Sequence, residues 1–460
     1  MKQLYPHQVN LVNMARMTGK KSVLLAAPTG IGKSVIASSI VHSAADKGKK
    51  CWLIVPRREL LRQMSGQFKD FNIDHTFIAQ NQKYIPMVSN VVASLQTLVR
   101  RLDGLTAPDL AIIDETHFGS TALDTVIKWL KANGTFILGL SATPWRLDGK
   151  GLGCWYDAMV EGPSIRWLID NGYLSDYKAF APDKLDLTGI RKLAGDYNQK
   201  DLADKMESDR VLVGNCVKHY MKHAMGLRGV TFTVSRKHSS IVCEAYNTAG
   251  IPAACIDGET PDDERKRLAR ALANKEILQL VNVDLLTFGY DLSAAAETDV
   301  TIEAMSDLRP TMSLALQMQK WGRVLRKKDR PAIILDHANN IDEHGKPCDE
   351  RVWSLQDREK KGKKDRGEVA VPFKTCTSCY HIHKPAPFCP NCGTVYPVMS
   401  REIEEIDGDL VEIDLAMARK EKRMQVGRAK SLGELQAIAK ERGYSPNWAF
   451  VQAKLKGLVK

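Results

Sequence analysis

Short runs of apolar residues alternate with amphipathic segments along the first third of the chain. Segments with the spacing of a helix, near residues 33–46, 57–69 and 122–132, separate these runs. Strands that are buried on both faces read as continuous apolar runs, and helices between them are typical of a parallel sheet. We therefore expect strands at residues 22–27, 51–55, 89–93, 110–113 and 136–140.

The same alternation returns after a mixed segment, at about residues 145–210, that is rich in Asp, Gly and Lys. The strands expected there are residues 229–234, 252–256, 278–283, 299–304 and 332–336. A chain of 460 residues is too long for a single core. The repeat therefore predicts an α/β fold with two tandem parallel-sheet domains, residues 1–178 and 179–345.

The character of the chain changes after about residue 345. The run QDREKKGKKDRGE (356–368) has almost no apolar residue, so we expect a solvated linker over residues 346–370, with a nucleic-acid contact as the second interpretation. A small cysteine-rich module is predicted at residues 371–400 and a helical tail at residues 401–460.

Composition and charge restrict the functional classes. With 44% hydrophobic and 26% charged residues, the chain has the make-up of a globular protein. It has no apolar run of bilayer length and no signal-peptide core, so we expect no membrane partner and a cytoplasmic location, in the host if the protein is viral. The net charge of +12 favours a polyanionic partner such as nucleic acid. We expect a monomer or a weak oligomer.

The ten cysteines do not indicate a disulfide scaffold. Six are scattered, several of them in strand-like or helical stretches, and are expected to be buried thiols: Cys51, Cys154, Cys216, Cys243, Cys255 and Cys348. The other four form two CxxC pairs with nine residues between them: Cys376, Cys379, Cys389 and Cys392. Four thiolates at this spacing predict one tetrahedral Zn²⁺ site, a zinc ribbon, in preference to a redox pair.

The neighbours of the cysteine pairs refine this prediction. Gly393 follows the second pair and permits a tight turn. His381 and His383 lie between the pairs and are expected on the surface of the ribbon rather than as zinc ligands. Whether the ribbon grips DNA or braces the tail stays open at this point.

A phosphate-binding loop is predicted at LLAAPTGIGKS, residues 24–34, between an expected strand and an expected helix. Its glycines let backbone N–H groups turn toward phosphate oxygens, and the helix N-terminus adds a favourable dipole. Lys33 would reach the β- and γ-phosphates, and the Ser34 hydroxyl would ligate Mg²⁺. The strict motif has glycine where this chain has Ala27.

Two adjacent carboxylates, Asp114 and Glu115, follow the expected strand at residues 110–113. A lone pair of this kind more often marks a strand that runs into solvent, and the phosphate loop is what favours a metal site here. Ligands of parallel α/β sheets lie beyond the carboxyl ends of the strands. Asp114 would hold Mg²⁺ through water, and Glu115 would polarise the water that attacks the γ-phosphate.

With these motifs in place, the chain resembles superfamily-two helicases of the DEAD/DEAH-like (DExH) kind over about residues 4–340. The resemblance rests on ordered motifs: LYPHQ (Q), APTGIGKS (I), VPRREL (Ia), SLQT (Ib), DETH (II), LSATPWR (III), FTVSRKHS (IV), VNVDLLTFGYD (V) and QKWGRVLR (VI). It implies two RecA-like domains with ATP and Mg²⁺ between them. The stretches DETH and TPWRLDGKGLG favour bacterial and phage DNA helicases, including UvsW-like enzymes that remodel branched DNA.

The resemblance implies a role for each matching residue. The nucleotide would be bound by Gln8, Ala27, Pro28, Thr29, Gly30, Ile31, Gly32, Lys33, Ser34, Gly289 and Asp291, and Mg²⁺ by Ser34 and Asp114. Coupling between the nucleotide and motif III would involve His117, Ser141, Thr143 and Gln319. Nucleic-acid phosphates would be held by Pro56, Arg57, Arg58, Ser94, Thr97, Ser235, Arg236 and Thr287.

Arg323 and Arg326 are three residues apart, on one face of a predicted helix. If the two sheets face each other, both side chains would reach the γ-phosphate as arginine fingers supplied by the same chain. The predicted catalytic residues are therefore Lys33, Asp114, Glu115, Arg323 and Arg326.

These residues predict an ATP-dependent DNA helicase or translocase with ATP, Mg²⁺ and Zn²⁺ as cofactors. Three alternatives stay open: an RNA helicase, the motor subunit of a restriction-type complex whose nuclease lies in a partner, and a helicase-shaped binding module that no longer hydrolyses ATP.

Overall fold

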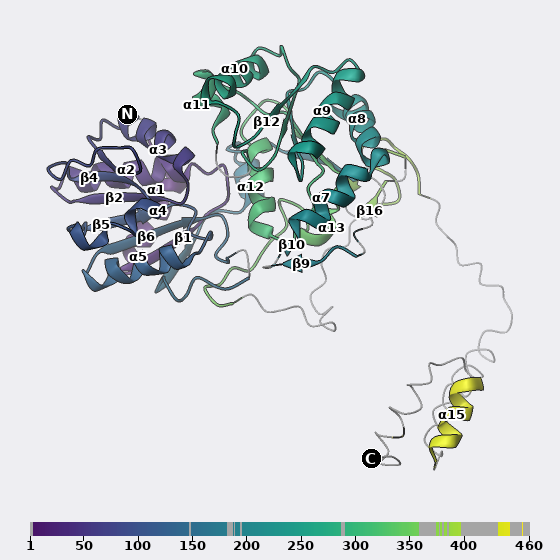
Figure 1. The fold of residues 1–460 in the computed structure, drawn as a ribbon, viewed down its shortest axis with the longest axis horizontal. Coiled ribbons are helices and arrows are strands. Elements are labelled where there is room, and N and C mark those ends of the chain that lie inside the picture. Colours follow the sequence, from purple (N-terminus) through teal and green to yellow (C-terminus); the bar gives the residue numbers. More distant parts are fainter. Residues whose placement is uncertain are drawn as a thin grey trace. The chain divides into compact units, whose positions relative to one another are not determined.

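The computed structural model describes residues 3–146, 149–181, 187, 189–193, 196–286, 290–357, 374–376, 378–379, 381–383, 386–396, 431–441 and 453. The chain divides into two compact units, Met1–Thr394 and Val395–Lys460. The first unit holds two α/β domains (Figure 1). In the second, the described part is centred on helix α15 (Leu432–Glu441), and most of the predicted tail lies outside the described residues. Among the described helices, none combines the length and the apolar character that a bilayer crossing requires.

The first domain contains a seven-stranded sheet in the order β3-β4-β2-β5-β6-β1-β7, and every pair of neighbouring strands is parallel. Its central strands are buried because helices lie on both faces of the sheet (Figure 1). The strands are β1 (Ser22–Ala26), β2 (Cys51–Val55), β3 (Thr76–Ile78), β4 (Asn90–Ser94), β5 (Leu110–Ile113), β6 (Phe136–Ser141) and β7 (Ala158–Glu161). The helices are α1 (Pro6–Met17), α2 (Lys33–Ala45), α3 (Arg58–Asp70), α4 (Leu95–Leu98), η1 (Leu102–Gly104), α5 (Thr121–Ala132) and α6 (Ile165–Asp170).

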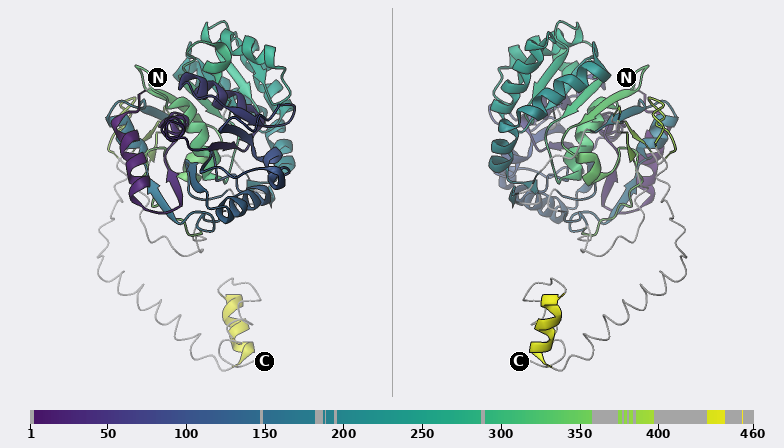
Figure 2. Two further views of the ribbon diagram at one scale, coloured as in Figure 1. Left: turned by 90° about the vertical axis from the view of Figure 1, so that its left-hand side faces the viewer. Right: turned by 90° about the vertical axis from the view of Figure 1, so that its right-hand side faces the viewer.

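The second domain contains a six-stranded parallel sheet in the order β12-β13-β11-β14-β15-β8. Figure 2 shows the two domains in two further views. The strands are β8 (Tyr177–Phe180), β11 (Gly229–Phe232), β12 (Ala253–Ile256), β13 (Gln279–Asn282), β14 (Ala304–Asp307) and β15 (Ala332–Asp336). The helices are α7 (Gln199–Ser208), α8 (Arg210–Ala224), α9 (Arg236–Thr248), α10 (Asp262–Ala273), α11 (Leu292–Ala296), α12 (Leu314–Val324) and α13 (Asn340–His344). Two short antiparallel pairs complete the fold, β9 (Lys192–Leu193) with β10 (Asp196–Tyr197), and β16 (Lys374–Thr375) with β17 (Ile382–His383).

The two parallel sheets confirm the predicted α/β class and its tandem arrangement. The prediction of a strand at residues 299–304 is wrong, because β14 is Ala304–Asp307. Val300 and Ile302 are buried, but they lie before the strand, which itself ends in the buried carboxylate of Asp307. An apolar run indicates burial, but it does not determine which of its residues form hydrogen bonds with the neighbouring strands.

The expectation that all six scattered cysteines are buried is correct for three of them. Cys51, Cys216 and Cys243 are buried, Cys348 is half-buried, and Cys154 and Cys255 are exposed. Cys255 lies on β12, an edge strand of the second sheet, so its apolar setting in the sequence did not predict its exposure.

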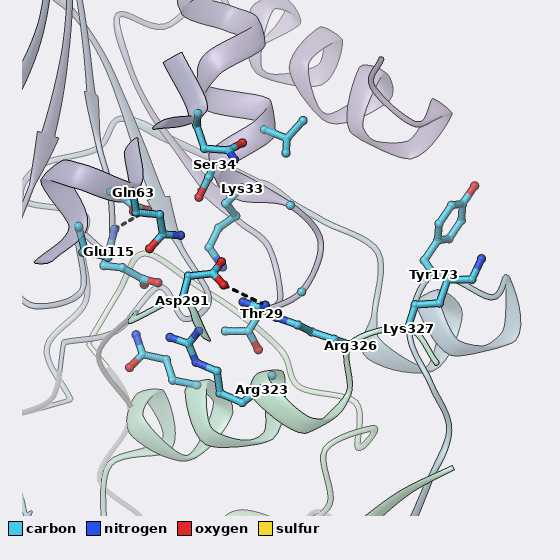
Figure 3. Close-up of a pocket in the computed structure, with 18 residues that line it drawn as sticks. Thr29, Lys33, Ser34, Gln63, Glu115, Tyr173, Asp291, Arg323, Arg326 and Lys327 are labelled. Atoms are coloured by element: carbon cyan, nitrogen blue, oxygen red, sulfur yellow. Dashed lines mark hydrogen bonds and ion pairs between the residues drawn. The ribbon is translucent and has the colours of Figure 1, made fainter. Parts of the chain in front are cut away.

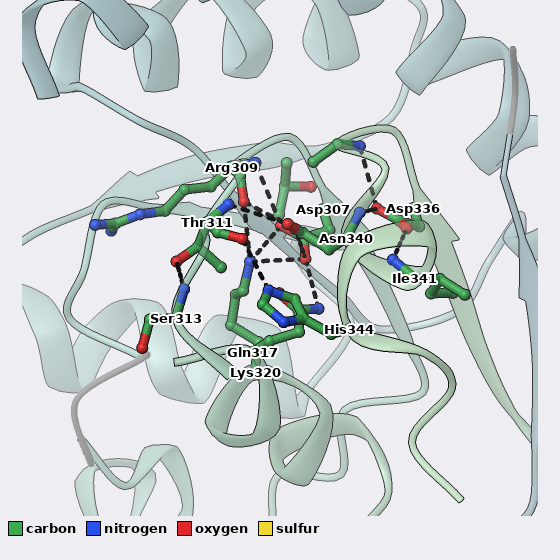
Figure 4. Close-up of polar contacts among 12 residues, drawn as sticks. Asp307, Arg309, Thr311, Ser313, Gln317, Lys320, Asp336, Asn340, Ile341 and His344 are labelled. Atoms are coloured by element: carbon green, nitrogen blue, oxygen red, sulfur yellow. Dashed lines mark hydrogen bonds and ion pairs between the residues drawn. The ribbon is translucent and has the colours of Figure 1, made fainter. Parts of the chain in front are cut away.

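A buried polar network fixes α12 against the end of β14 (Figure 4). Asp307 accepts hydrogen bonds from Lys320 Nζ at 2.7 and 2.8 Å, from Gln317 Nε2 at 3.0 Å and from Asn340 Nδ2 at 3.0 Å. Lys320 Nζ also donates to the carbonyl of Arg309 at 3.0 Å. Lys320 and Asp307 are at most 1% exposed, so each charge depends on the other for solvation.

Replacement of Lys320 by methionine would leave the Asp307 carboxylate buried without its counter-charge. We expect the free energy of unfolding to fall by about 3–5 kcal/mol, measured by urea denaturation. The exposed Lys20→Met variant serves as the control, with an expected change below about 0.5 kcal/mol. A Lys320→Met variant as stable as this control would contradict the account of the network.

Candidate active site

A cavity of about 390 Å³ lies between the two domains, beyond the carboxyl ends of β1 and β5 in the first domain and against α12 of the second (Figure 3). From the first domain it is lined by Thr29, Gly30, Gly32, Lys33, Ser34, Val35, Leu60, Gln63, Gln67, Asp114, Glu115 and Tyr173. From the second it is lined by Asp291, Gln319, Gly322, Arg323, Arg326 and Lys327. The cavity therefore brings residues of motifs I, II, V and VI into one space.

The loop between β1 and α2 is shaped by its own backbone and by the amide of Gln8. Gly32 has φ +88°, and a Cβ there would lie 2.7 Å from Gln8 Nε2, so this position requires glycine. Gln8 Nε2 donates to the carbonyl of Ile31 at 2.7 Å, and Gln8 Oε1 accepts from the backbone N–H of Tyr5 at 2.8 Å. The Gln8 side chain is buried and braces the loop.

Lys33 begins α2 with its ammonium folded back over the loop. Its Nζ donates to the carbonyls of Ala27 at 3.1 Å and Pro28 at 3.4 Å. The N-terminus of α2 opens on the same cavity, since Ser34 also lines it. An ammonium and the first N–H groups of a helix together form an anion site of the kind that binds phosphates.

Asp114 and Glu115 follow β5 and line the first-domain side of the cavity, as Lys33 does. Burial, and then the neighbouring Glu115 carboxylate, raise the pKa of Asp114 to about 7. Glu115 has a positive φ of 46°, and its buried Oε2 accepts no hydrogen bond from the described residues, although His117 Nδ1 lies 3.3 Å away. This unsatisfied oxygen and the raised pKa of Asp114 fit a divalent cation, which Asp114 and the Ser34 hydroxyl would hold.

A chain of buried polar contacts leads from the acids to motif III. His117 Nδ1 lies 3.3 Å from Glu115 Oε2 and 2.9 Å from Ser141 Oγ. Ser141 Oγ in turn bonds to the carbonyl of Thr143 and accepts from its N–H at 3.1 Å. Burial lowers the pKa of His117, so the neutral ring serves as a link between the carboxylate and the loop after β6.

The two arginines of motif VI enter the cavity from the second domain. Arg323 is near the end of α12, whereas Arg326 lies beyond the last helical residue, Val324, and pairs with Asp291 at 3.8 Å (Figure 3). Burial, and then the adjacent Arg326 guanidinium, lower the pKa of Arg323 to about 10. Two neighbouring cations that destabilise one another in a cavity favour the entry of a polyanion.

Direct contacts hold the two sides of the cavity together. Thr29 Oγ1 in the phosphate loop donates to the carbonyl of Met318 on α12 at 2.9 Å. Arg62 on α3 pairs with Asp262 at the start of α10. The two domains are therefore close together in this structure, with α12 in contact with the phosphate loop.

The predicted nucleotide-binding residues do not all face the cavity. Thr29, Gly30, Gly32, Lys33, Ser34 and Asp291 line it. Ala27 and Ile31 are loop residues whose side chains are buried, and Pro28 lines another cavity. Gln8 contacts the loop through the carbonyl of Ile31. Gly289 lies outside the described residues. Gln319 lines the cavity, and its buried Oε1 has no hydrogen-bond partner among the described residues.

Seven residues that line the cavity were not predicted as site residues: Val35, Leu60, Gln63, Gln67, Tyr173, Gly322 and Lys327. Tyr173 belongs to an aromatic cluster, with ring centroids 5.1 Å from Tyr5 and 4.3 Å from His7. Tyr5 and His7 stand in the LYPHQ motif, but nothing in the sequence relates them to Tyr173. Gln63 and Gln67 are spaced by one helical turn on α3, which was the available signal for a shared face.

The predicted nucleic-acid contacts lie at the carboxyl ends of strands in both domains. Pro56 and Arg57 follow β2, Ser94 ends β4 and is buried, and Thr97 is half-buried on α4. In the second domain, Ser235 donates to Glu207 at 2.6 Å and caps α9, and Arg236 pairs with Asp257 at 3.0 Å and with Glu259. A phosphate at Arg236 would therefore replace two carboxylates. Thr287 and the side chain of Arg58 lie outside the described residues.

The four clustered cysteines converge on one point. Their sulfur atoms all lie within 4.8 Å of one another, with 3.6 Å between Cys376 and Cys392 and between Cys379 and Cys389. Sulfurs on a tetrahedral zinc at about 2.3 Å are separated by about 3.8 Å. The donor set and its spacing therefore fit Zn²⁺, and Gly393 makes its turn with φ +73°.

The cysteine module packs on the edge strand β8 of the second sheet. His381 forms an antiparallel bridge with Phe180, and Lys178 Nζ donates to Asn391 Oδ1 at 3.2 Å. His383 is buried, so the expectation that both histidines lie on the ribbon surface is wrong for this residue. His381 is half-buried because its ring lies 5.5 Å from that of Phe180. The module covers an otherwise open sheet edge.

Comparison with known proteins gives matches along most of the chain. A family described as "Type III restriction enzyme, res subunit" matches residues 1–146. A 51.5 kDa protein of a Lactococcus phage is 30% identical over 94% of this chain and 89% of its own length. A protein of Schizosaccharomyces pombe, named as the mitochondrial ATP-dependent helicase irc3, is 26% identical over 70% of this chain and 55% of its own length.

Solved structures with similar backbones are more distant. Dbp5 of S. cerevisiae bound to RNA and ADP BeF3 has a TM-score of 0.47 and 13% identity, over 74% of this chain and 90% of that one. The Type ISP restriction-modification enzyme LlaBIII bound to DNA has a TM-score of 0.49 and 16% identity, over 73% of this chain and 27% of that one.

The phage protein is 30% identical to this chain over almost the whole length of both, and this similarity shows the family of the chain. It belongs to the family of the Lactococcus phage 51.5 kDa protein.

Proposed function

We propose that this protein is a Mg²⁺-dependent ATPase that uses hydrolysis to move along, unwind or remodel DNA. One observation supports this most directly: the loop lysine, the paired acids and both motif VI arginines face the same cavity from two different domains. A binding module without hydrolysis would not need Glu115 and the two arginines in one space.

The residues of the cleft would divide the reaction between them. Lys33 and the N-terminus of α2 would bind the β- and γ-phosphates, and Mg²⁺ held by Ser34 and Asp114 would neutralise phosphate charge. Glu115 would orient the attacking water and accept its proton. Arg323 and Arg326 would stabilise the charge that develops on the γ-phosphoryl group as its bond to the leaving oxygen breaks.

Movement would follow from the same contacts. The arginines bind the γ-phosphate only when the domains are closed, so the loss of that group would favour opening. His117 contacts both Glu115 and Ser141, so the nucleotide state would reach the loop after β6 through side chains already in contact. The protein would contact the nucleic acid at the carboxyl ends of β2, β4 and β11, mainly through its phosphates. These contact sites would then shift relative to one another.

DNA is the favoured substrate, with branched DNA as a subclass. The match of residues 1–146 to a restriction-enzyme subunit and the kinship with a phage protein support DNA. The match to a restriction-enzyme subunit is also compatible with the alternative that the protein is the motor subunit of a complex whose nuclease lies in a partner. Such a protein would act in the cytoplasm of the host cell.

We also propose that the cysteine module is a structural zinc site that braces β8. Its sulfur spacing fits Zn²⁺, and Lys222 Nζ on α8 donates to the carbonyl of Ser378 at 3.1 Å, which ties the module to the second domain.

Glu115→Gln should abolish turnover and leave ATP binding intact, because the amide keeps the shape of the side chain and cannot accept the proton. We expect kcat for ATP hydrolysis to fall by about 10²–10⁴-fold, with little change in the affinity for a non-hydrolysable analogue. The exposed Glu244→Gln variant is the control. Undiminished turnover in Glu115→Gln would remove this residue from the mechanism.

Stimulation of ATP hydrolysis should depend on the nucleic acid supplied. We expect single-stranded, forked and four-way-junction DNA to stimulate the steady-state rate at least about tenfold more than RNA of matched sequence, with junctions highest, and rising salt to weaken the effect. Equal stimulation by RNA would favour the RNA-helicase alternative, and equal stimulation by all DNA forms would remove the branched-DNA preference.

The cysteine module should carry one zinc ion per chain. We expect elemental analysis to find about one equivalent in the purified protein and almost none in Cys379→Ser, since a tetrahedral site needs all four thiolates. The exposed, unclustered Cys154→Ser variant should retain its zinc. A metal-free protein that folds with native β8 contacts would contradict the structural role.

A further inference from the structure

A segment beyond the second sheet returns to the first domain. The chain leaves α13 and runs over residues 346–357, here called the strap, toward the first domain (Figure 1). It occupies the first part of the stretch for which a solvated linker was predicted. The strap has one end fixed on each domain.

The near end is fixed by Arg351. Its guanidinium donates to four backbone carbonyls at 2.8–3.3 Å, those of His344, Lys346, Pro347 and Asp349. The same group lies 6.0 Å above the ring of Trp321 on α12. Trp321 is fully buried two residues before Arg323, so the root of the strap packs on the helix that carries the motif VI arginine.

The far end is fixed on the loop that follows motif III. Trp353 lies against Trp145, with ring centroids 5.0 Å apart, and Trp145 Nε1 donates to the carbonyl of Gln356 at 3.0 Å. The N–H of Gly153 donates to the carbonyl of Leu355 at 2.9 Å. The N–H of Gly151 donates to Asp357 Oδ1 at 2.9 Å, and Leu355 packs against the core of the first domain.

The strap therefore contacts the loop after motif III and helix α12, both of which are next to the proposed ATP site. Trp145 stands two residues after Thr143, which is bonded to Ser141 in the link from Glu115. Beneath the strap, a cavity of about 300 Å³ is lined by Pro28 of the phosphate loop, Ala142 of motif III and Met318 of α12. Val352 and Trp353 form its outer wall.

We propose that the strap is a positioning element that holds the motif III loop and α12 close together and limits the opening of the nucleotide cleft. A second connection between the domains raises the population of the closed arrangement that binds ATP. The apparent dissociation constant of a ligand rises as the competent population falls, so loss of the strap acts on ATP affinity. Chemistry at saturating ATP is spared, because Arg323 and Glu115 are unchanged. The inference rests on the proposed ATPase function.

Gly151→Ala separates the strap from the loop with one methyl group. The added Cβ would lie 2.1 Å from the carbonyl oxygen of Leu355 and 2.4 Å from the carbonyl carbon of Gln356, both backbone atoms. Gly151 does not have a positive φ, so alanine is compatible with its own backbone. Gly104→Ala is the matched control in the same domain, since a Cβ there meets nothing within 4 Å. Trp353→Ala and Trp353→Phe form a second pair, of which the phenylalanine keeps an aromatic contact with Trp145.

The experiment combines hydrogen exchange without nucleotide and steady-state ATP hydrolysis on the full chain. We expect faster exchange at the amide of Gly153 and a rise of about tenfold in KM for ATP in Gly151→Ala and Trp353→Ala, with kcat changed by less than about twofold. Gly104→Ala and Trp353→Phe should resemble the unaltered protein.

The proposal is wrong if Gly153 already exchanges rapidly in the unaltered protein. It is equally wrong if KM in Gly151→Ala matches that in Gly104→Ala while exchange shows the strap released. Absence of hydrolysis by the unaltered protein would instead contradict the proposed function. The exchange measurement needs no ATP and would still decide whether the strap is docked.

Discussion

The structure depends on the opposition of charge across one cleft. The first domain contributes an ammonium, the buried carboxylate of Asp114 and the half-buried carboxylate of Glu115. The second contributes two guanidinium groups, and burial and then the charge of Arg326 lower the pKa of Arg323. Each set is poorly solvated without a ligand: the pKa of Asp114 is raised by burial and that of Arg323 is lowered by burial. A magnesium–triphosphate would compensate both sets at once, and only a closed cleft presents both.

The rest of the fold holds these groups in place. The pair Asp307–Lys320 fixes α12 to the second sheet, and the carbonyl of Met318 on the same helix accepts a hydrogen bond from Thr29 of the phosphate loop. On the other wall, His117 and Ser141 connect Glu115 to the loop after β6. The strap joins that loop to α12 from behind, and the cysteine module covers the edge of the sheet that carries α12. Positioning thus uses contacts far apart in the sequence.

Much of the candidate site could be predicted from short sequence motifs. A glycine-rich loop between a strand and a helix predicts a phosphate site without information from the rest of the chain. In the same way, acids at the end of an apolar run predict a metal site. The zinc prediction was local as well, because two CxxC pairs specify donor type and spacing. The strand at β14 was misplaced because its buried Asp307 has a partner, Lys320, that no local pattern reveals. Gln8 was expected to bind the nucleotide, and in the structure its amide is hydrogen-bonded to Tyr5 and Ile31.

The sequence by itself therefore determined the two-sheet architecture. It also predicted the groups that would bind phosphate, magnesium and zinc, and it carries the motifs that resemble those of superfamily-two helicases. These follow from periodicity and short motifs, in which the residues that matter are neighbours along the chain. Only the tertiary structure decided that Tyr173 and Lys327 border the cleft, that Arg236 is already paired with acids, and that residues 353–357 contact the first domain. These are contacts between distant segments, set by packing and by the pairing of buried polar groups, and no local pattern encodes them.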